Sequence, residues 1–319
     1  MSDRDIRYCT TEDGASIAYS VRGDGPPLVM TPFLMESFTL EEISPAYHAF
    51  SERLARSVRL IQYDLRGTGS STRSTVADKL ESFTYDLEAV VHAVGVSKVS
   101  VFGRAVGCTP AMHLAARRRE IVDRLILLAP AARTADVIAT EETSGMIQLC
   151  RGNWGLASRM LADLSSREEF GDKALKNAEW YRKSTSGEVM ARLIEIYSQE
   201  RVTNEELSRI ACPTLILQPT DDSRWTPEAG QRVAALIPGA SFRLLAGGLH
   251  TFALGDAEPV LQALADFLGI AASTPTADST SVRTVLFTDL VGHTEMMSRS
   301  ATSAGARCCA STNESPAKS

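Results

Sequence analysis

The chain has 319 residues, of which 44% are hydrophobic, and a formal net charge of −6, as expected for a globular protein with one large α/β domain or two small ones. Acids and bases are mixed along the chain, no apolar stretch could cross a bilayer, and the charged amino terminus is no signal peptide, so neither nucleic acid nor a membrane is an expected partner. Six cysteines without paired spacing indicate reduced thiols in a cytoplasmic protein.

Short apolar stretches alternate with helical patterns over the first 130 residues. The apolar stretches predict strands at residues 16–21, 28–31, 58–64, 98–103 and 123–130. Helical spacing of apolar residues predicts helices at residues 47–57, 84–94 and 106–118. The first two strands flank a Gly-Asp-Gly-Pro-Pro turn, which predicts a hairpin at an antiparallel edge of the sheet.

The second half of the chain interrupts and then resumes this alternation. Residues 131–211 are helical in pattern, and strands at 213–219 and 240–247 then alternate with helices at 226–237 and 258–270. We therefore predict an α/β fold with a mostly parallel central sheet and helices on both faces. Its core would be residues 1–130 and 212–270. Residues 131–211 would form a helical cap over the carboxyl ends of the strands, where open α/β sheets bind ligands.

The composition changes after residue 270. Residues 271–281 are rich in Ala, Ser and Thr and are expected to be a linker. Residues 282–299 have the pattern of one strand and the start of a helix. Residues 300–319 contain almost no large apolar side chain, which predicts a disordered tail.

A glycine-flanked turn follows the predicted strand at 98–103. Gly103 and Gly107 occupy the glycine positions of a nucleophile elbow, in which a strand, a sharp turn and a helix present a nucleophile at the centre. The central residue here is Ala105, whose methyl group cannot attack a carbonyl. The backbone of an elbow is therefore predicted without the serine that would do the chemistry.

An acid and a histidine follow later strands in the order that a catalytic triad requires. Asp222 comes after the strand at 213–219, with Asp221 as the alternative acid, and His250 follows the strand at 240–247. In a working triad the acid orients the histidine, and the histidine deprotonates the serine. Elbow, acid and histidine each stand at the end of a predicted strand, so we interpret them as one site.

At these residues the chain resembles the α/β-hydrolase superfamily, from about residue 7 to residue 270. The sequence DLRGTGSS at 64–71 and the helical cap are further landmarks of this resemblance. The chain is most similar to the hydrolase-like modules fused in front of class III adenylate/guanylate cyclases. Residues 282–299 resemble the start of such a cyclase domain, and Asp289 would match its first metal-binding aspartate. The cyclase-like segment ends before a second metal aspartate, so we expect no cyclase activity, no metal site and no cofactor.

The remaining parts of the site are predicted from the same turn. The oxyanion hole would use the backbone N–H of Val106 and that of Phe33 or Leu34, because Pro32 has no N–H. Arg104 adjoins the elbow and could bind an anionic ligand, although a solvated surface arginine is favoured. Cys108 is interpreted as a packing residue rather than a replacement nucleophile.

Three hypotheses for the function follow. The first is a module that binds a small carbonyl or ester compound without hydrolysing it efficiently, as a sensor in a hydrolase–cyclase fusion. The second is an active serine esterase in which the serine at position 105 was changed to alanine. The third is a cofactor-independent lyase or oxygenase that uses His250 and Asp222 as a base. A homodimer is a further open expectation.

Overall fold

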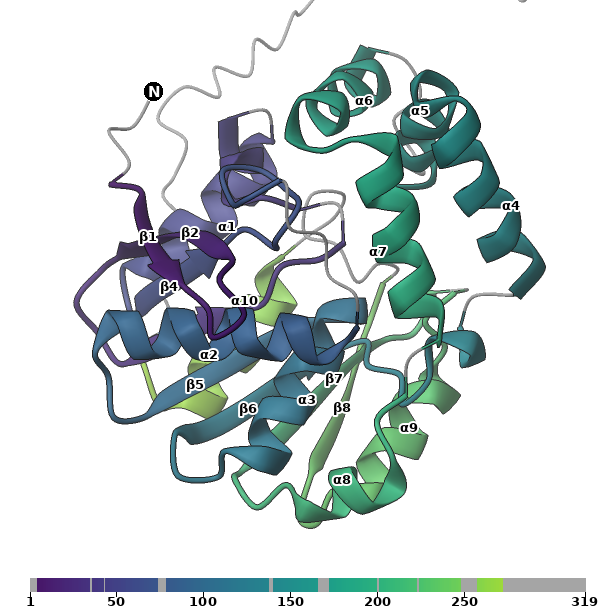
Figure 1. The fold of residues 1–319 in the computed structure, drawn as a ribbon. Helices are drawn as coiled ribbons and strands as arrows, with labels where there is room; N and C mark the ends of the chain where they lie inside the picture. Colours follow the sequence, from purple (N-terminus) through teal and green to yellow (C-terminus); the bar gives the residue numbers. More distant parts are fainter. Residues whose placement is uncertain are drawn as a thin grey trace, which may run out of the picture. The chain divides into compact units, whose positions relative to one another are not determined.

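The structure is a computed structural model that describes residues 5–34, 36–42, 44–73, 79–137, 140–165, 172–199, 201–222, 224–247 and 257–271. Their strands form a single sheet (Figure 1). The strands are β1 (Arg7–Thr10), β2 (Ser16–Arg22), β3 (Pro27–Met30), β4 (Arg59–Tyr63), β5 (Val99–Arg104), β6 (Val122–Leu128), β7 (Thr214–Pro219) and β8 (Ser241–Leu245). Their order in the sheet is β1-β2-β4-β3-β5-β6-β7-β8.

The antiparallel edge of the sheet differs from the predicted one. The pairs β1–β2 and β2–β4 are antiparallel, and every other neighbouring pair is parallel. The predicted hairpin of β2 and β3 is wrong, because β4 lies between these two strands. The edge hairpin is instead β1–β2. The sequence did not reveal β1 because three of its four residues are exposed and leave no apolar alternation.

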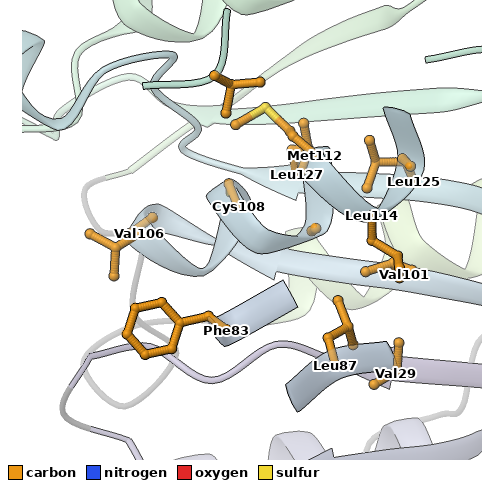
Figure 2. Packing of buried hydrophobic residues seen from close by; sticks show 14 of the residues in the cluster. Val29, Phe83, Leu87, Val101, Val106, Cys108, Met112, Leu114, Leu125 and Leu127 are labelled. Atoms are coloured by element: carbon orange, nitrogen blue, oxygen red, sulfur yellow. The ribbon is translucent and has the colours of Figure 1, made fainter. Parts of the chain in front are cut away.

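Helices cover both faces of the sheet (Figure 1). One face carries α1 (Pro45–Ala55) and α10 (Glu258–Leu268), and the other carries α2 (Glu81–Val94), α3 (Cys108–Arg117) and α9 (Pro227–Leu236). Strand β5 is buried throughout, and its side chains alternate between the two faces. Val101 faces the cluster that also contains Leu87 and Leu114 (Figure 2), whereas Phe102 packs toward α1, with its ring centroid 6.5 Å from that of Phe50.

A helical insert separates β6 from β7. It contains α4 (Thr140–Gly152), α5 (Trp154–Ser165), α6 (Asp172–Ser184), α7 (Gly187–Gln199) and α8 (Asn204–Arg209). Short 3-10 helices occur at η1 (Phe38–Glu42), η2 (Ala105–Gly107) and η3 (Thr134–Asp136). Helices α4–α7 share an apolar core of their own, and α7 also packs on the body, where the Tyr197 ring stacks on Phe83 with centroids 4.9 Å apart.

The turn between α6 and α7 is fastened to the loop that follows β4. Thr185 Oγ1 donates a hydrogen bond to the carbonyl of Gly67 at 2.9 Å, and the N–H of Gly69 donates to the carbonyl of Ser184 at 2.8 Å. Because this loop leaves the carboxyl end of its strand, the contact brings the insert to that edge of the sheet.

Several sequence predictions fall on residues that the structure does not describe. His250, most of the expected linker at 271–281, the cyclase-like segment 282–299 with Asp289, and the tail 300–319 all lie outside the described residues. Within the described part of the chain, no helix combines the length and the apolar character that a membrane span needs.

Candidate active site

The turn after β5 has the geometry of an elbow. Strand β5 ends at Arg104, η2 follows at once, and α3 begins at Cys108. Ala105 has a φ of +47°, in the left-handed region that costs a residue with a side chain about 1–2 kcal/mol. Such a backbone angle is retained only where the surroundings enforce it, and it is common at functional sites. The backbone is thus sharply turned at the residue where the pattern places a nucleophile.

Both flanking glycines are required by close approaches. A Cβ on Gly103 would lie 2.9 Å from the Cα of Cys108. A Cβ on Gly107 would lie 2.9 Å from the carbonyl oxygen of Pro32 and 2.9 Å from Thr31 Oγ1. The first glycine therefore lets strand and helix pack together, and the second lets the turn pack against the loop that follows β3. Thr31 Oγ1 also donates a hydrogen bond to the carbonyl of Gly107 at 2.8 Å.

The structure distinguishes the two candidate donors in the loop after β3. The N–H of Phe33 donates to Glu36 Oε2 at 3.0 Å, so it is engaged within its own loop. The N–H of Leu34, in contrast, has no acceptor in the part of the chain that the structure describes. Val106 lies in η2, directly before α3, and N–H groups at the start of a helix lack acceptors in their own helix. Leu34 is therefore kept with Val106 as the pair of candidate oxyanion donors.

Arg104 is buried, and the surface interpretation favoured from the sequence is wrong. Its exposed fraction is 3%, and its guanidinium forms an ion pair with Glu36, which is 5% exposed. The guanidinium carbon also lies 5.9 Å from the centre of the Tyr47 ring. The reason is the alternation along β5, because Arg104 shares with Phe102 the face that α1 covers. The sequence missed Glu36 because 68 positions separate it from Arg104.

Cys108 is a packing residue, as predicted. Its side chain is fully buried, and its Sγ lies 3.5 Å from the carbonyl oxygen of Leu128, to which it donates. Burial raises the pKa of the Cys108 thiol far above its ordinary value. The thiol is therefore protonated at neutral pH and cannot replace a serine nucleophile.

Of the two candidate acids, Asp222 is the buried one. Asp222 is 3% exposed, and its Oδ1 accepts hydrogen bonds from the backbone N–H groups of Arg224 at 3.0 Å and Trp225 at 2.9 Å. Asp221 is exposed and accepts a hydrogen bond from Thr220 Oγ1 at 2.9 Å. A carboxylate held rigidly by backbone donors is the better choice to orient a histidine.

The loops that carry the acid and the histidine start side by side. Strands β7 and β8 are parallel neighbours, and the N–H of Asp221 donates to the carbonyl of Gly247 at 3.3 Å. His250 follows three positions after Gly247 but lies outside the described residues. No group of three or more His, Cys, Asp or Glu that could hold a metal ion occurs among the described residues.

Comparison with known proteins identifies the family of the chain. Residues 40–257 match the family described as serine aminopeptidase, S33, which is most of the chain. The chain belongs to this family. It is thereby a member of the α/β-hydrolase superfamily, as the sequence resemblance indicates.

Two relatives of this S33-family chain have names that describe hydrolases. The chain is 26% identical over 242 residues to RutD of Klebsiella pneumoniae, whose name describes it as a carbamate hydrolase. The alignment covers 70% of this chain and 85% of that protein. A soluble epoxide hydrolase of Corynebacterium is 29% identical over 129 residues, 40% of this chain and 43% of that protein.

Solved structures confirm the predicted fold class. The enol-lactonase of Burkholderia xenovorans superposes with a TM-score of 0.68 and 21% identity, over 82% of this chain and all (100%) of that one. An esterase from Exiguobacterium antarcticum gives a TM-score of 0.69 at 18% identity, over 82% and 98%. At these identities the likeness establishes the α/β-hydrolase fold.

Proposed function

We propose that this S33-family protein binds a small carbonyl or ester compound at the elbow and does not hydrolyse it efficiently. The observation that carries the proposal is Ala105, which keeps the strained backbone of a nucleophile position but has no oxygen. The resemblance of residues 282–299 to a cyclase start favours a sensor role in fusions that carry a complete cyclase.

The residues around position 105 favour binding of a polarised carbonyl oxygen. The N–H of Val106 lies two residues before α3 begins, next to the helix end at which the dipole attracts negative charge. The N–H of Leu34 would be the second donor. Asp222 would hold His250 in one orientation at the same edge of the sheet. Without a hydroxyl at position 105, no acyl-enzyme can form, so a bound ester would stay intact.

A serine esterase with an altered nucleophile is the second candidate. The backbone strain at Ala105 favours this second candidate. A φ of +47° presents a serine nucleophile at the turn, whereas an alanine gains nothing from it. Neighbouring hydrolase and esterase structures are consistent with this reading. Both candidates predict the same dormant site, and they differ only in the residue that the source gene encodes at position 105.

The change Ala105→Ser tests both candidates. The chain as written should release almost no p-nitrophenol from p-nitrophenyl butyrate, and Ala105→Ser should raise kcat at least about 10³-fold. The reason is that loss of the serine alone costs a well-studied protease about 10⁶-fold. Steady-state kinetics of the two purified proteins measure the difference.

His250→Ala provides the control. In the Ala105→Ser background it should remove the gained activity, because no base would remain to deprotonate the hydroxyl. An Ala105→Ser protein that folds but stays inactive would contradict the proposal of a dormant triad. Turnover by the chain as written that vanishes on His250→Ala would contradict the binding-only reading and support base catalysis through water.

A further inference from the structure

One buried carboxylate connects the two segments that supply the candidate oxyanion donors. Glu36 lies in the loop after β3, two residues beyond Leu34, and its side chain is 5% exposed. Its Oε2 accepts the N–H of Phe33 at 3.0 Å and also meets Nη2 of Arg104. Arg104 immediately precedes position 105. A single oxygen atom therefore joins the donor loop to the elbow.

The hydrogen bond to Phe33 fixes the peptide next to the candidate donor. The peptide plane that carries the N–H of Leu34 begins at the carbonyl of Phe33, whose oxygen accepts the N–H of Glu36 at 2.9 Å. Glu36 thus holds Phe33 from both sides, through its own N–H and through its carboxylate. The direction of the N–H of Leu34 depends on these two contacts.

The ion pair with Arg104 fixes the loop relative to the elbow. Both charged groups are almost fully buried, so their attraction is little screened by water. Tyr47 of α1 supports the pair, since its ring lies under the guanidinium and its hydroxyl accepts a hydrogen bond from Gln62 Nε2 at 3.2 Å. Thr31 makes a second connection at the other end of the loop through Gly107. The loop is thereby tied to the elbow at both of its ends.

We infer that Glu36 is a positioning residue that sets the direction of the Leu34 N–H through Phe33 and Arg104, and so shapes the oxyanion hole. This inference rests on the proposed function, because it assumes that Leu34 and Val106 receive the same carbonyl oxygen. Glu36 would not touch the ligand. Its effect should therefore be on stabilisation of the transition state rather than on binding of the ground state.

The kinetic test uses Ala105→Ser as the parent. Glu36→Ala should lower kcat for p-nitrophenyl butyrate by about 10–100-fold, somewhat less than the loss of a donor itself, while KM changes by less than about threefold. Glu36→Gln keeps an oxygen that can accept the N–H of Phe33, so it should retain kcat within about fivefold. That rescue by the conservative variant separates positioning from mere structural support.

Glu41→Gln is the matched control. Glu41 is also a buried acid near this loop, and it forms an ion pair at 2.6 Å with Arg22 of β2. It should leave both kcat and KM unchanged. If Glu36→Ala keeps the parental kcat per folded molecule, or raises KM alone, the inference is wrong.

A second measurement does not depend on activity. Hydrogen–deuterium exchange of the protein with alanine at position 105 should show that Glu36→Ala accelerates exchange of two amides, each by about tenfold or more. These are the amide of Phe33, which loses its acceptor Glu36 Oε2, and the amide of Cys108, which donates to the carbonyl of Ala105. Acceleration at Phe33 alone would overturn the coupling. If the alanine variant does not fold, the exchange experiment uses the double variant Glu36→Gln/Arg104→Met, which removes both charges.

The two tests separate the inference from the proposed function. An inactive Ala105→Ser protein contradicts the proposed function, and the exchange experiment then still decides whether Glu36 couples loop and elbow. Active Ala105→Ser with no response to Glu36→Ala contradicts the inference alone.

Discussion

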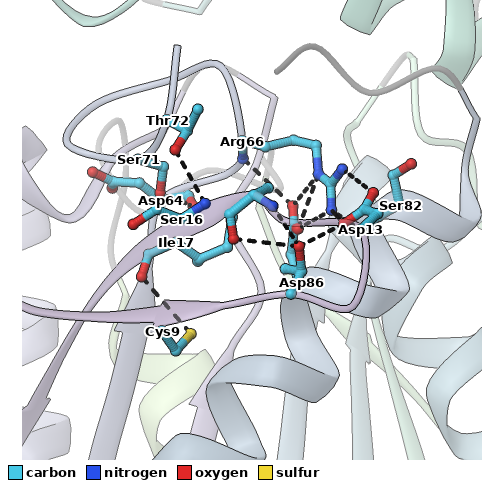
Figure 3. Close-up of polar contacts among 12 residues, drawn as sticks. Cys9, Asp13, Ser16, Ile17, Asp64, Arg66, Ser71, Thr72, Ser82 and Asp86 are labelled. Atoms are coloured by element: carbon cyan, nitrogen blue, oxygen red, sulfur yellow. Dashed lines mark hydrogen bonds and ion pairs between the residues drawn. The ribbon is translucent and has the colours of Figure 1, made fainter. Parts of the chain in front are cut away.

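Two buried arginines, each at the carboxyl end of a strand, have different roles in this fold. Arg66 follows β4 and is 1% exposed, and its guanidinium contacts the carboxylates of Asp86 and Asp13 and the carbonyl of Ser82 (Figure 3). Arg104 ends β5 and meets Glu36 in the loop after β3. Both arginines form ion pairs, but the partners of Arg66 come from α2 and from the turn between β1 and β2.

The difference shows that burial of a charge does not by itself indicate a functional site. None of the partners of Arg66 adjoins position 105, so that cluster holds the loop, a helix and the edge hairpin together. Arg104 and Glu36 belong to the two segments that supply the candidate oxyanion donors. The position of the partners in the sheet, rather than the strength of the pair, separates a structural arginine from a positioning one.

The largest effect on stability is expected from removal of Arg66, the structural arginine of this comparison. Arg66→Met should lower the free energy of unfolding by about 3–5 kcal/mol, because it leaves Asp86, which is fully buried, without its cation. Urea denaturation measures this loss. Arg66→Met/Asp86→Leu should recover much of it. A loss below about 1 kcal/mol for the single variant would mean that the Arg66 cluster does not stabilise the folded protein.

A smaller effect is expected from the elbow glycines. Gly107→Ala should cost about 1–3 kcal/mol, because the new methyl group would meet the backbone of Pro32 and Thr31 Oγ1. The matched control is Gly145→Ala in α4, where a Cβ meets nothing within 4 Å, and there stability should rise by about 0.5–1 kcal/mol. Equal effects of the two changes, measured by thermal unfolding, would contradict the close packing of the elbow.

The smallest effect concerns a partly exposed cluster of three side chains, Glu206 with His113 and Arg117, toward the other end of α3. Glu206 lies 3.1 Å from both His113 Nδ1 and Arg117 Nη2. Burial opposes ionisation of Glu206, but the backbone N–H of Thr203 and the neighbouring side chains of His113 and Arg117 outweigh it and lower its pKa to about 2. A lowered pKa gives stability that is present above the ordinary value of 4.5 and is lost as the pH falls toward 2.

Glu206→Gln tests the sign of this contribution. The Tm of the unmodified chain should exceed that of Glu206→Gln by about 2–4 °C at pH 5, and the gap should narrow by pH 3. Differential scanning calorimetry at the two pH values checks this. A gap that widens on acidification would contradict the lowered pKa.

The sequence predicted most of the sheet because its strands are short buried apolar stretches. It failed at the edge, where β1 is exposed on three of four positions, and it paired β2 with β3 because a turn joins them in the sequence. Local turn signals cannot show that β4, from later in the chain, is inserted between two strands. Neighbours in a sheet are set by long-range packing.

The same limit applies to the candidate site. Ala105, Gly103 and Gly107 were found from one contiguous pattern, and the structure gives them elbow geometry. Asp222 and Asp221 could not be separated until burial and backbone donors distinguished them. Glu36 was missed, because only the pairing of β3 with β5 brings it to Arg104. Residues that act through a neighbouring strand leave no signal in local spacing.

The central claim is that the elbow lacks only its nucleophile, and covalent labelling of Ala105→Ser tests it most directly. A fluorophosphonate should transfer its phosphonyl group to the new hydroxyl, with an O–P bond formed, fluoride released and the hydroxyl proton taken by His250. Ala129→Ser is the matched control, since Ala129 is also buried with a positive φ of +53° at a strand end. Mass spectrometry should find one phosphonyl group per chain of Ala105→Ser, on the peptide that contains position 105, and none on Ala129→Ser. A folded Ala105→Ser protein that stays unlabelled would contradict the account.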